Sequence, residues 1–205
     1  MNGLLDYKKA NALMARYGIK SVGSAYLKNP EDAIEFSGGK PIVLKALTQK
    51  ALHKTKSGLV MLNLSGSREI RNGFTKLTKK ASRYGPYTIL GQHMVKGGLE
   101  IILGGNVDKQ FGKMVLLGLG GIYVEAFRDF ALRLCPITRY DANSMIDQLR
   151  SHSVVAPNPR QREMLVNLLM AVSKLFSDND IAELDLNPVI LHDGTYDVVD
   201  IRILK

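Results

Sequence analysis

The C-terminal segment from Glu183 to Ile203 constrains the fold more than any other stretch of this sequence. Two runs rich in apolar and β-branched residues flank Asp193-Gly194, a dipeptide that favours a two-residue type I′ turn because both central positions need positive φ. The segment therefore predicts a β-hairpin in which His192 faces Thr195.

The register of this hairpin places polar side chains together on one face. Counting back from the turn puts Asn187 opposite Asp200 and Asp185 opposite Arg202, and side chains two apart on a strand point the same way. Directly opposed Cβ atoms lie about 4.5–5.5 Å apart, so amide and carboxylate oxygens can converge on one hard cation. A surface hairpin whose polar face meets water is the alternative interpretation.

Length and composition are those of a folded protein with a sizeable core. The chain has 205 residues, of which 45% are hydrophobic and 23% charged. No run approaches 18 consecutive apolar residues, and the first residues lack the apolar core of a signal peptide. We therefore expect a cytoplasmic protein with no membrane partner. The single cysteine, Cys135, can close no internal disulfide and is interpreted as a small core residue.

Much of the formal net charge of +9 comes from a basic segment, residues 40–83, in which Glu69 is the only acid. Its basic residues are Lys40, Lys45, Lys50, Lys54, Lys56, Arg68, Arg71, Lys76, Lys79, Lys80 and Arg83. A segment of this kind implies an anionic partner, whether nucleotide phosphate, nucleic acid or an acidic protein surface. A solvated helix face is the alternative explanation for the last four.

The order of helical and strand-like patterns predicts an α+β fold. Helices are expected at 4–16, from Asn29-Pro30 to Gly38-Gly39, at about 67–83, at about 141–150 and at about 159–176. Strands are expected at 41–47, 59–64, 87–95, 99–104, 113–118, 121–127 and 129–135. A boundary at Gly85-Pro86 predicts a small subdomain over 1–85 and a larger one over 86–205.

Two sets of charged residues are candidates for binding chemistry. Lys45 lies in an apolar run that reads as a buried strand, where a charge is costly unless an anion compensates it. The loop that follows carries His53 and Lys54, which makes phosphate the natural ligand, although the pattern is not that of a Walker loop. Glu125 and Arg133 lie in neighbouring alternating runs and can face one cleft. Snorkelling of Lys45 and a rim salt bridge are the structural alternatives.

Six motifs follow one another in an order that resembles a known family. They are Pro41-Ile-Val-Leu-Lys-Ala with Leu-His-Lys and Gly58, Val95-Lys-Gly-Gly-Leu-Glu-Ile-Ile-Leu-Gly104, Asp108-Lys-Gln-Phe-Gly112, Gly118-Leu-Gly-Gly-Ile-Tyr-Val-Glu-Ala-Phe-Arg-Asp129, Arg133-Leu-Cys-Pro-Ile-Thr138 and Glu183-Leu-Asp-Leu-Asn-Pro188. Together they resemble the ATP-grasp portion of NDP-forming acyl-CoA synthetases, notably the separate β subunit of archaeal ADP-forming acetate–CoA ligase.

The resemblance implies an ATP-grasp fold, with a small lid subdomain, a larger subdomain and the nucleotide between two sheets. By that pattern Lys45 touches the nucleotide phosphates. The hinge residues Gln92, Met94 and Val95 bind adenine, and Glu100 binds the ribose.

The resemblance also implies the residues at the phosphate end. Asn187 and Asp200 match positions that bind Mg²⁺, with Asp185 beside them. Arg133 and Glu125 line the phosphate end of the site. The catalytic loop is that of His53 and Lys54, where His53 either carries the phosphoryl group or hydrogen-bonds phosphate.

The reaction implied is acyl-CoA + ADP + phosphate ⇌ carboxylic acid + CoA + ATP, with ATP/ADP and Mg²⁺ as cofactors. The CoA-binding domains and a phosphohistidine belong to a partner α subunit, and an α2β2 complex is expected. The Arg-Gly element that the family carries between its last two helices is missing from 151–159. This departure leaves open a nucleotide-binding regulatory subunit without turnover. A nucleic-acid binder and a stand-alone ligase are less favoured, because the basic segment coincides with the phosphate-loop motifs and no acyl-acceptor site is evident.

Overall fold

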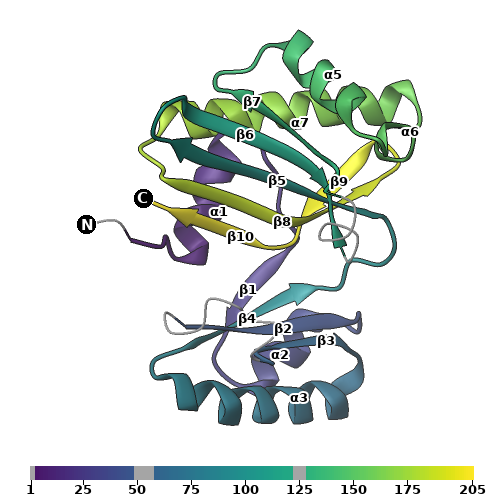
Figure 1. The fold of residues 1–205 in the computed structure, drawn as a ribbon. Coiled ribbons are helices and arrows are strands. Elements are labelled where there is room, and N and C mark those ends of the chain that lie inside the picture. The colour runs from purple at the N-terminus through teal and green to yellow at the C-terminus, as the bar shows by residue number, and fades with distance from the viewer. Residues whose placement is uncertain (1–2, 49–57, 122–127) are drawn as a thin grey trace. The chain divides into compact units, whose positions relative to one another are not determined.

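The computed structural model describes residues 3–48, 58–121 and 128–205, and the chain divides into two compact units (Figure 1). One unit is residues 22–96, and the other combines residues up to 21 with 97–205. The boundary predicted at Gly85-Pro86 differs from this division, because the following strand β4 (Thr88–His93) pairs with β1 (Ser24–Leu27) and β2 (Ile42–Leu47). The N-terminal helix α1 (Tyr7–Arg16), predicted in the smaller part, belongs to the other unit.

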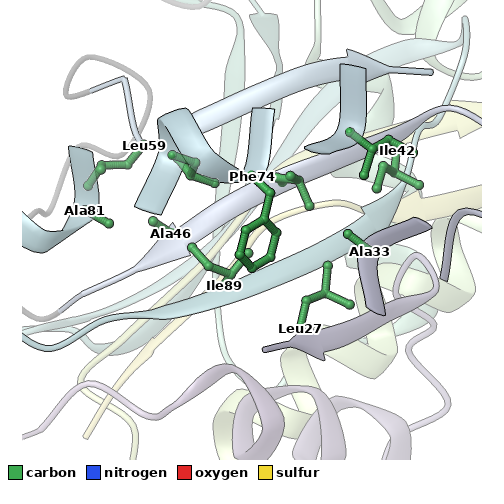
Figure 2. Packing of buried hydrophobic residues seen from close by; sticks show 11 residues of the cluster. Leu27, Ala33, Ile42, Ala46, Leu59, Phe74, Ala81 and Ile89 are labelled. Atoms are coloured by element: carbon green, nitrogen blue, oxygen red, sulfur yellow. The ribbon is translucent and has the colours of Figure 1, made fainter. Parts of the chain in front are cut away.

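The 22–96 unit is a four-stranded antiparallel sheet with helices on one face. The strand order is β1-β4-β2-β3, where β3 spans Val60–Leu64, and the helices are α2 (Pro30–Ser37) and α3 (Gly66–Ala81). The sequence pattern did not predict strand β1. Figure 2 shows its core, in which Phe74 from α3 meets apolar side chains of the sheet such as Ala46 and Ile89.

The second unit is built on an antiparallel sheet whose strands differ in length. The strand order is β10-β8-β5-β6-β7, and β9 pairs with β8. The bounds are β5 Leu99–Asp108, β6 Gly112–Leu119, β7 Phe130–Leu134, β8 Glu183–His192, β9 Thr195–Val198 and β10 Ile201–Leu204. Helices α5 (Arg139–Gln148) and α7 (Pro159–Asp178) pack on β5 to β7, α1 packs on β10, and α6 (His152–Val155) adjoins α5. The strand expected at 121–127 lies outside the described residues, apart from residue 121.

The C-terminal hairpin has the predicted register. His192 pairs with Thr195, and Asp185 pairs with Arg202, so the same register continues through β10. Gly194 has φ of +69°, but Asp193 is not among the described residues with positive φ, so the turn is not the predicted type I′, which needs positive φ at both central positions. The hairpin prediction is confirmed.

Alternation along the strands divides the sheet of the second unit into two faces. Gly105, Leu184 and Ile203 occupy equivalent positions on neighbouring strands, and Gly105 lies against the ring of Phe176 in α7. This is the helix-covered face. Gly104, Asp185 and Arg202 therefore point to the opposite face, which we call the open face.

Helix termini account for most boundary differences. Thr138 caps α5 in a capping box with Asp141, so the helix begins at Arg139 rather than at Asp141 as predicted. Asn158 and Pro159 start α7 as predicted. Its last carbonyls are covered by Lys113, whose Nζ donates to Phe176 O, Ser177 O and Asn179 O at 2.8, 3.2 and 2.6 Å.

The second unit is interrupted in the sequence by residues 22–96, and the residues just before and just after this interruption lie against the C-terminal hairpin. Before residue 22, Ser21 forms a parallel bridge with Val198, and the Lys20 amide donates to the Tyr196 hydroxyl at 3.2 Å. After residue 96, Gly98 lies so close to the hairpin that an added Cβ would approach Leu191 O to 2.7 Å. In the part of the chain that the structure describes, none of the helices has the length and apolar character needed to cross a membrane.

Candidate functional site

The open face of the second unit gathers the oxygen-rich side chains of the hairpin. Asp185 lies between Gly104 on β5 and Arg202 on β10 in the ladder. Two residues further along, continuing the register places Asn187 opposite Asp200, and the Val199 amide donates to Pro188 O at 3.0 Å, which holds the two segments together there. The face predicted from the turn is therefore present.

Electrostatics show that the two carboxylates of this face are close. Burial raises the pKa of Asp185 above its usual range, and the negative charge of Asp200 raises it further. The Arg202 guanidinium offsets part of this rise, while Glu183 adds to it. Two like charges held near each other in a partly desolvated position are stabilised by a cation.

The donor set fits a hard divalent cation such as Mg²⁺. Asp185 and Asp200 supply carboxylate oxygens and Asn187 supplies an amide oxygen, which are the ligand types that Mg²⁺ takes in proteins. Within the described ranges no group of three or more His, Cys, Asp or Glu side chains is placed to hold a metal, so the amide is needed to complete the set.

Glu100 lies on the same open face, nearer the start of β5. It is exposed, and it shares its face with Ile102 and Gly104 by strand alternation. Its carbonyl accepts from the Gly120 amide at 2.7 Å. An added Cβ at Gly120 would come within 2.8 Å of the Glu100 carbonyl carbon, so glycine is required here by close backbone approach.

In the 22–96 unit, Lys45 and Gln92 share the face of the sheet that points away from α2 and α3. Ile42, Leu44 and Ala46 of β2 belong to the core beneath the helices, so Lys45 points the other way. Gln92 pairs with Val43, and Lys45 pairs with Leu90, which makes the two side chains diagonal neighbours. Lys45 is 5% exposed and Gln92 is 1% exposed.

The hinge segment after β4 is anchored by backbone hydrogen bonds. The His93 amide donates to Gly23 O and the Met94 amide donates to Pro41 O, each at 3.0 Å. The His93 ring stacks on Phe36 with a centroid separation of 4.5 Å. Within the described part of the chain, Val95 has no such backbone bond, which leaves its amide for a ligand.

The structure places Arg133 away from the open face, contrary to its predicted place at the phosphate end. Arg133 pairs with Val115, which is fully buried on the helix-covered face. Its guanidinium donates to Gln148 Oε1 at 2.9 Å and to Ser144 Oγ at 2.8 Å, both on α5. Arg133 therefore joins β7 to α5. The predicted residues His53, Lys54 and Glu125 lie outside the described residues.

Sequence reasoning placed Arg202 on this face but gave it no role. Its Nε is shielded from solvent and has no hydrogen-bond partner among the described residues. The register that brought Arg202 opposite Asp185 was the signal available from sequence.

Comparison with known proteins identifies the family. The model of the ATP-grasp domain matches residues 1–204. The β subunit of ADP-forming acetate–CoA ligase II of Pyrococcus furiosus is 33% identical, over 98% of this chain and 91% of that protein. A structure of the dinucleotide-forming acetyl-coenzyme A synthetase 1 of Ca. Korarchaeum cryptofilum with coenzyme A and Ca-AMPCP has a TM-score of 0.89 at 33% identity, covering 98% of this chain and 93% of that one.

A second structure of the Korarchaeum enzyme holds coenzyme A and Mg-AMPPCP, with its phosphohistidine segment pointing towards the nucleotide-binding site. It superposes with a TM-score of 0.82 at 32% identity, covering 98% of this chain and 92% of that chain. The chain belongs to the ATP-grasp family, among the β subunits of ADP-forming acetate–CoA ligases.

Proposed function

We propose that this chain is the nucleotide-binding subunit of an ADP-forming acyl-CoA synthetase and transfers a phosphoryl group between a phosphohistidine and ADP or ATP. The observation that supports this proposal is the open face of the second unit, where the register puts Asp185, Asn187 and Asp200 on one face in a chain that aligns with such β subunits over nearly its whole length.

Each unit, taken by itself, offers residues suited to a part of the nucleotide. Lys45 neutralises phosphate charge, and its burial makes an anionic ligand favourable. The Val95 amide, which makes no backbone hydrogen bond among the described residues, donates to adenine, and Gln92 and Met94 lie beside it in the hinge. Glu100 accepts hydrogen bonds from the ribose hydroxyls.

Asp185, Asn187 and Asp200 would hold Mg²⁺ on the open face. A magnesium ion held there would supply positive charge against the phosphates, which is the main requirement of phosphoryl transfer. The residues of the chain hold the phosphates in the orientation that the transfer needs. His53 and Lys54 enter this proposal from the resemblance alone, with His53 as the residue that meets the incoming phosphoryl group.

The partner is a CoA-binding α subunit that carries the phosphohistidine, in an α2β2 complex. Two observations on relatives support a separate partner. The Pyrococcus protein is named as a β subunit, and the Korarchaeum enzyme binds coenzyme A and has a phosphohistidine segment that points towards its nucleotide-binding site. The present chain supplies the nucleotide half of such a reaction.

Substitution of the metal ligands tests the proposal. Asn187→Ala or Asp200→Ala in the complex should reduce Mg²⁺-dependent ATP formation from acetyl-CoA, ADP and phosphate by about a hundredfold or more. The reason is that the metal lowers the activation free energy by several kcal/mol, because it stabilises the charge that develops in the transition state. The thermal midpoint should change little in Asp200→Ala, because the repulsion of Asp185 is lost together with the hydrogen bond that Asp200 accepts from the Ile201 amide at 3.2 Å. Asp180→Ala, an exposed carboxylate elsewhere, is the matched control. Full activity in either variant would overturn the assignment.

The same assay separates the catalytic subunit from a regulatory one. Co-purification of the chain from its native organism should recover a protein with a CoA-binding domain. Adding the chain to that partner should produce ATP formation that the partner alone lacks. A rate equal to that of the partner alone, together with retained nucleotide binding, favours a regulatory subunit instead.

A further inference from the structure

Arg202 is a strongly charged residue on the open face that the proposed roles above leave unused. It stands directly opposite Asp185, and the described residues give it one ion pair, from Nη1 to Glu183 Oε1 at 3.5 Å. Its Nε is shielded from solvent without an acceptor among the described residues. A desolvated N–H without a partner is costly, and the Arg202 side chain as a whole is 38% exposed, so an anion can still approach the guanidinium.

The position of Arg202 along the sheet indicates which acceptor. On β5 the open face carries Glu100, Ile102 and Gly104 in that order. Glu100 marks the ribose end in the proposed function, and the level of Asn187 and Asp200 follows. Gly104, Asp185 and Arg202 form the next level, directly across three neighbouring strands. A nucleotide that runs from Glu100 past the metal ligands reaches this level with its terminal phosphate.

The floor of the sheet is bare at Gly104 itself, although Leu116 pairs with Gly104 on the neighbouring strand and shares its face. Gly104 has no side chain, and an added Cβ there would meet nothing nearer than Leu184 O at 3.4 Å. Packing therefore does not require glycine at this position. The effect of glycine is to leave space on the open face beside Asp185 and Arg202.

We propose that Arg202 binds the terminal phosphoryl group of the nucleotide, above the bare floor at Gly104. The inference rests on the proposed function and deepens it, because it names the residue that distinguishes a nucleoside triphosphate from a diphosphate. The planar guanidinium suits this task, since its forked N–H groups match the oxygens of a phosphate.

The experiment measures nucleotide binding rather than turnover. The full chain, with its α partner where isolated, is titrated calorimetrically with Mg²⁺ plus either ADP or a β,γ-methylene analogue of ATP. Arg202→Lys keeps the positive charge near Asp185 but loses the forked donors. It should weaken the triphosphate analogue by about tenfold, as expected for a lost hydrogen bond to a charged group, and leave ADP binding unchanged.

Two further variants keep the test independent of folding defects. Glu183→Gln removes the ion-pair partner of Arg202 and should leave triphosphate binding at the wild-type level or tighter. Gly104→Val fills the bare floor with a residue that suits a strand, and should weaken the triphosphate analogue but not ADP. Thermal unfolding confirms that each variant is folded.

The outcomes are distinguishable. Equal loss of ADP and triphosphate binding in Arg202→Lys would overturn the terminal-phosphate role, as would no loss of either. A loss in Glu183→Gln equal to that in Arg202→Lys would make the ion pair itself the cause and would also overturn it. Failure of the wild-type chain to bind either nucleotide would instead contradict the proposed function.

Discussion

Asp129 joins the start of β7 to the connection between α5 and α6. Its carboxylate accepts hydrogen bonds from the Arg150 amide at 2.8 Å, the Ser151 amide at 2.9 Å and the Ser151 hydroxyl at 2.5 Å. Burial acts to raise the pKa of Asp129, but the bonds from Ser151 and Arg150 outweigh it, so the pKa lies below its ordinary value of 3.8. The ionised form is therefore the one that stabilises the fold.

Asp129→Asn should lower the free energy of unfolding near pH 7 by about 1.5–3 kcal/mol, because the charge that strengthens these bonds is lost. A carboxyl whose pKa is lower in the folded state stabilises above its unfolded pKa, and that contribution is lost as pH falls through the folded value. The difference between wild type and variant should thus shrink below about pH 4 in urea unfolding. Asp180→Asn should show no such difference. A gap that stays constant into strong acid would contradict the prediction.

At the residue scale, the face of the sheet on which a side chain lies could be predicted only where a turn fixed the pairing register of its strand. The Asp193-Gly194 turn fixed the register of the hairpin, so Asp185, Asn187, Asp200 and Arg202 were placed on one face from sequence. For β7 the sequence offered a two-residue turn at Arg128-Asp129, with Arg133 and Glu125 facing one cleft. In the structure β7 pairs with β6 in a register that no sequence signal fixed, and this register places Arg133 on the helix side with Val115.

The adjacent glycines of β5, Gly104 and Gly105, lie on opposite faces of the sheet. Gly105 lies under the ring of Phe176, with an added Cβ at 3.0 Å from Cδ1, and Phe176 is fully buried. Gly104 lies on the open face, where a Cβ fits. Gly105 is required because α7 packs on it, whereas no packing contact among the described residues requires glycine at position 104.

Gly105→Ala should destabilise the protein by about 1–3 kcal/mol, because the added methyl overpacks the buried ring. Gly104→Ala, the matched control one residue away, should change stability by less than about 0.5 kcal/mol or increase it slightly. Urea unfolding of both variants provides the comparison. Equal effects at the two positions would show that the contact of α7 with β5 does not discriminate between them.

At the element scale, capping and turn signals predicted helices better than strands. Asn29-Pro30 and Asn158-Pro159 located two helix starts, because these residues satisfy or avoid the free amides of a first turn. Strand β1 was missed, because its four residues carry no alternation strong enough to stand out, and its position depends on pairing with β4. The four-residue helix α6 was missed for the same reason, as no periodicity is visible over one turn.

The molecule as a whole is one unit interrupted by another. Residues 22–96 have their own core of buried side chains from the sheet, α2 and α3. The predicted boundary at Gly85-Pro86 followed a strong turn signal, yet it would remove β4 from the middle of the sheet. Local breaker residues mark the ends of elements, whereas unit boundaries depend on pairing between distant segments.

A fragment of residues 22–96 should therefore fold alone, with a cooperative thermal transition in far-UV circular dichroism. A fragment of residues 22–85 is the control and should not fold, because β1 and β2 lose the strand between them. Phe74→Ala in the longer fragment should cost about 3–5 kcal/mol and abolish its transition. Cooperative folding of the shorter fragment would show that the boundary lies where the turn signal placed it.

Ser21 and Gly98 lie on either side of the 22–96 unit in the sequence, and both are held against one hairpin. Ser21 bridges Val198, Gly98 touches Leu191, and these hairpin positions are near neighbours across the ladder. The entry and exit of the 22–96 insertion are thus tied to adjacent points. A linker of about six residues is long enough to replace the insertion. The two units can be exchanged as modules between related chains, with Asp200 and the rest of the open face carried intact by the recipient.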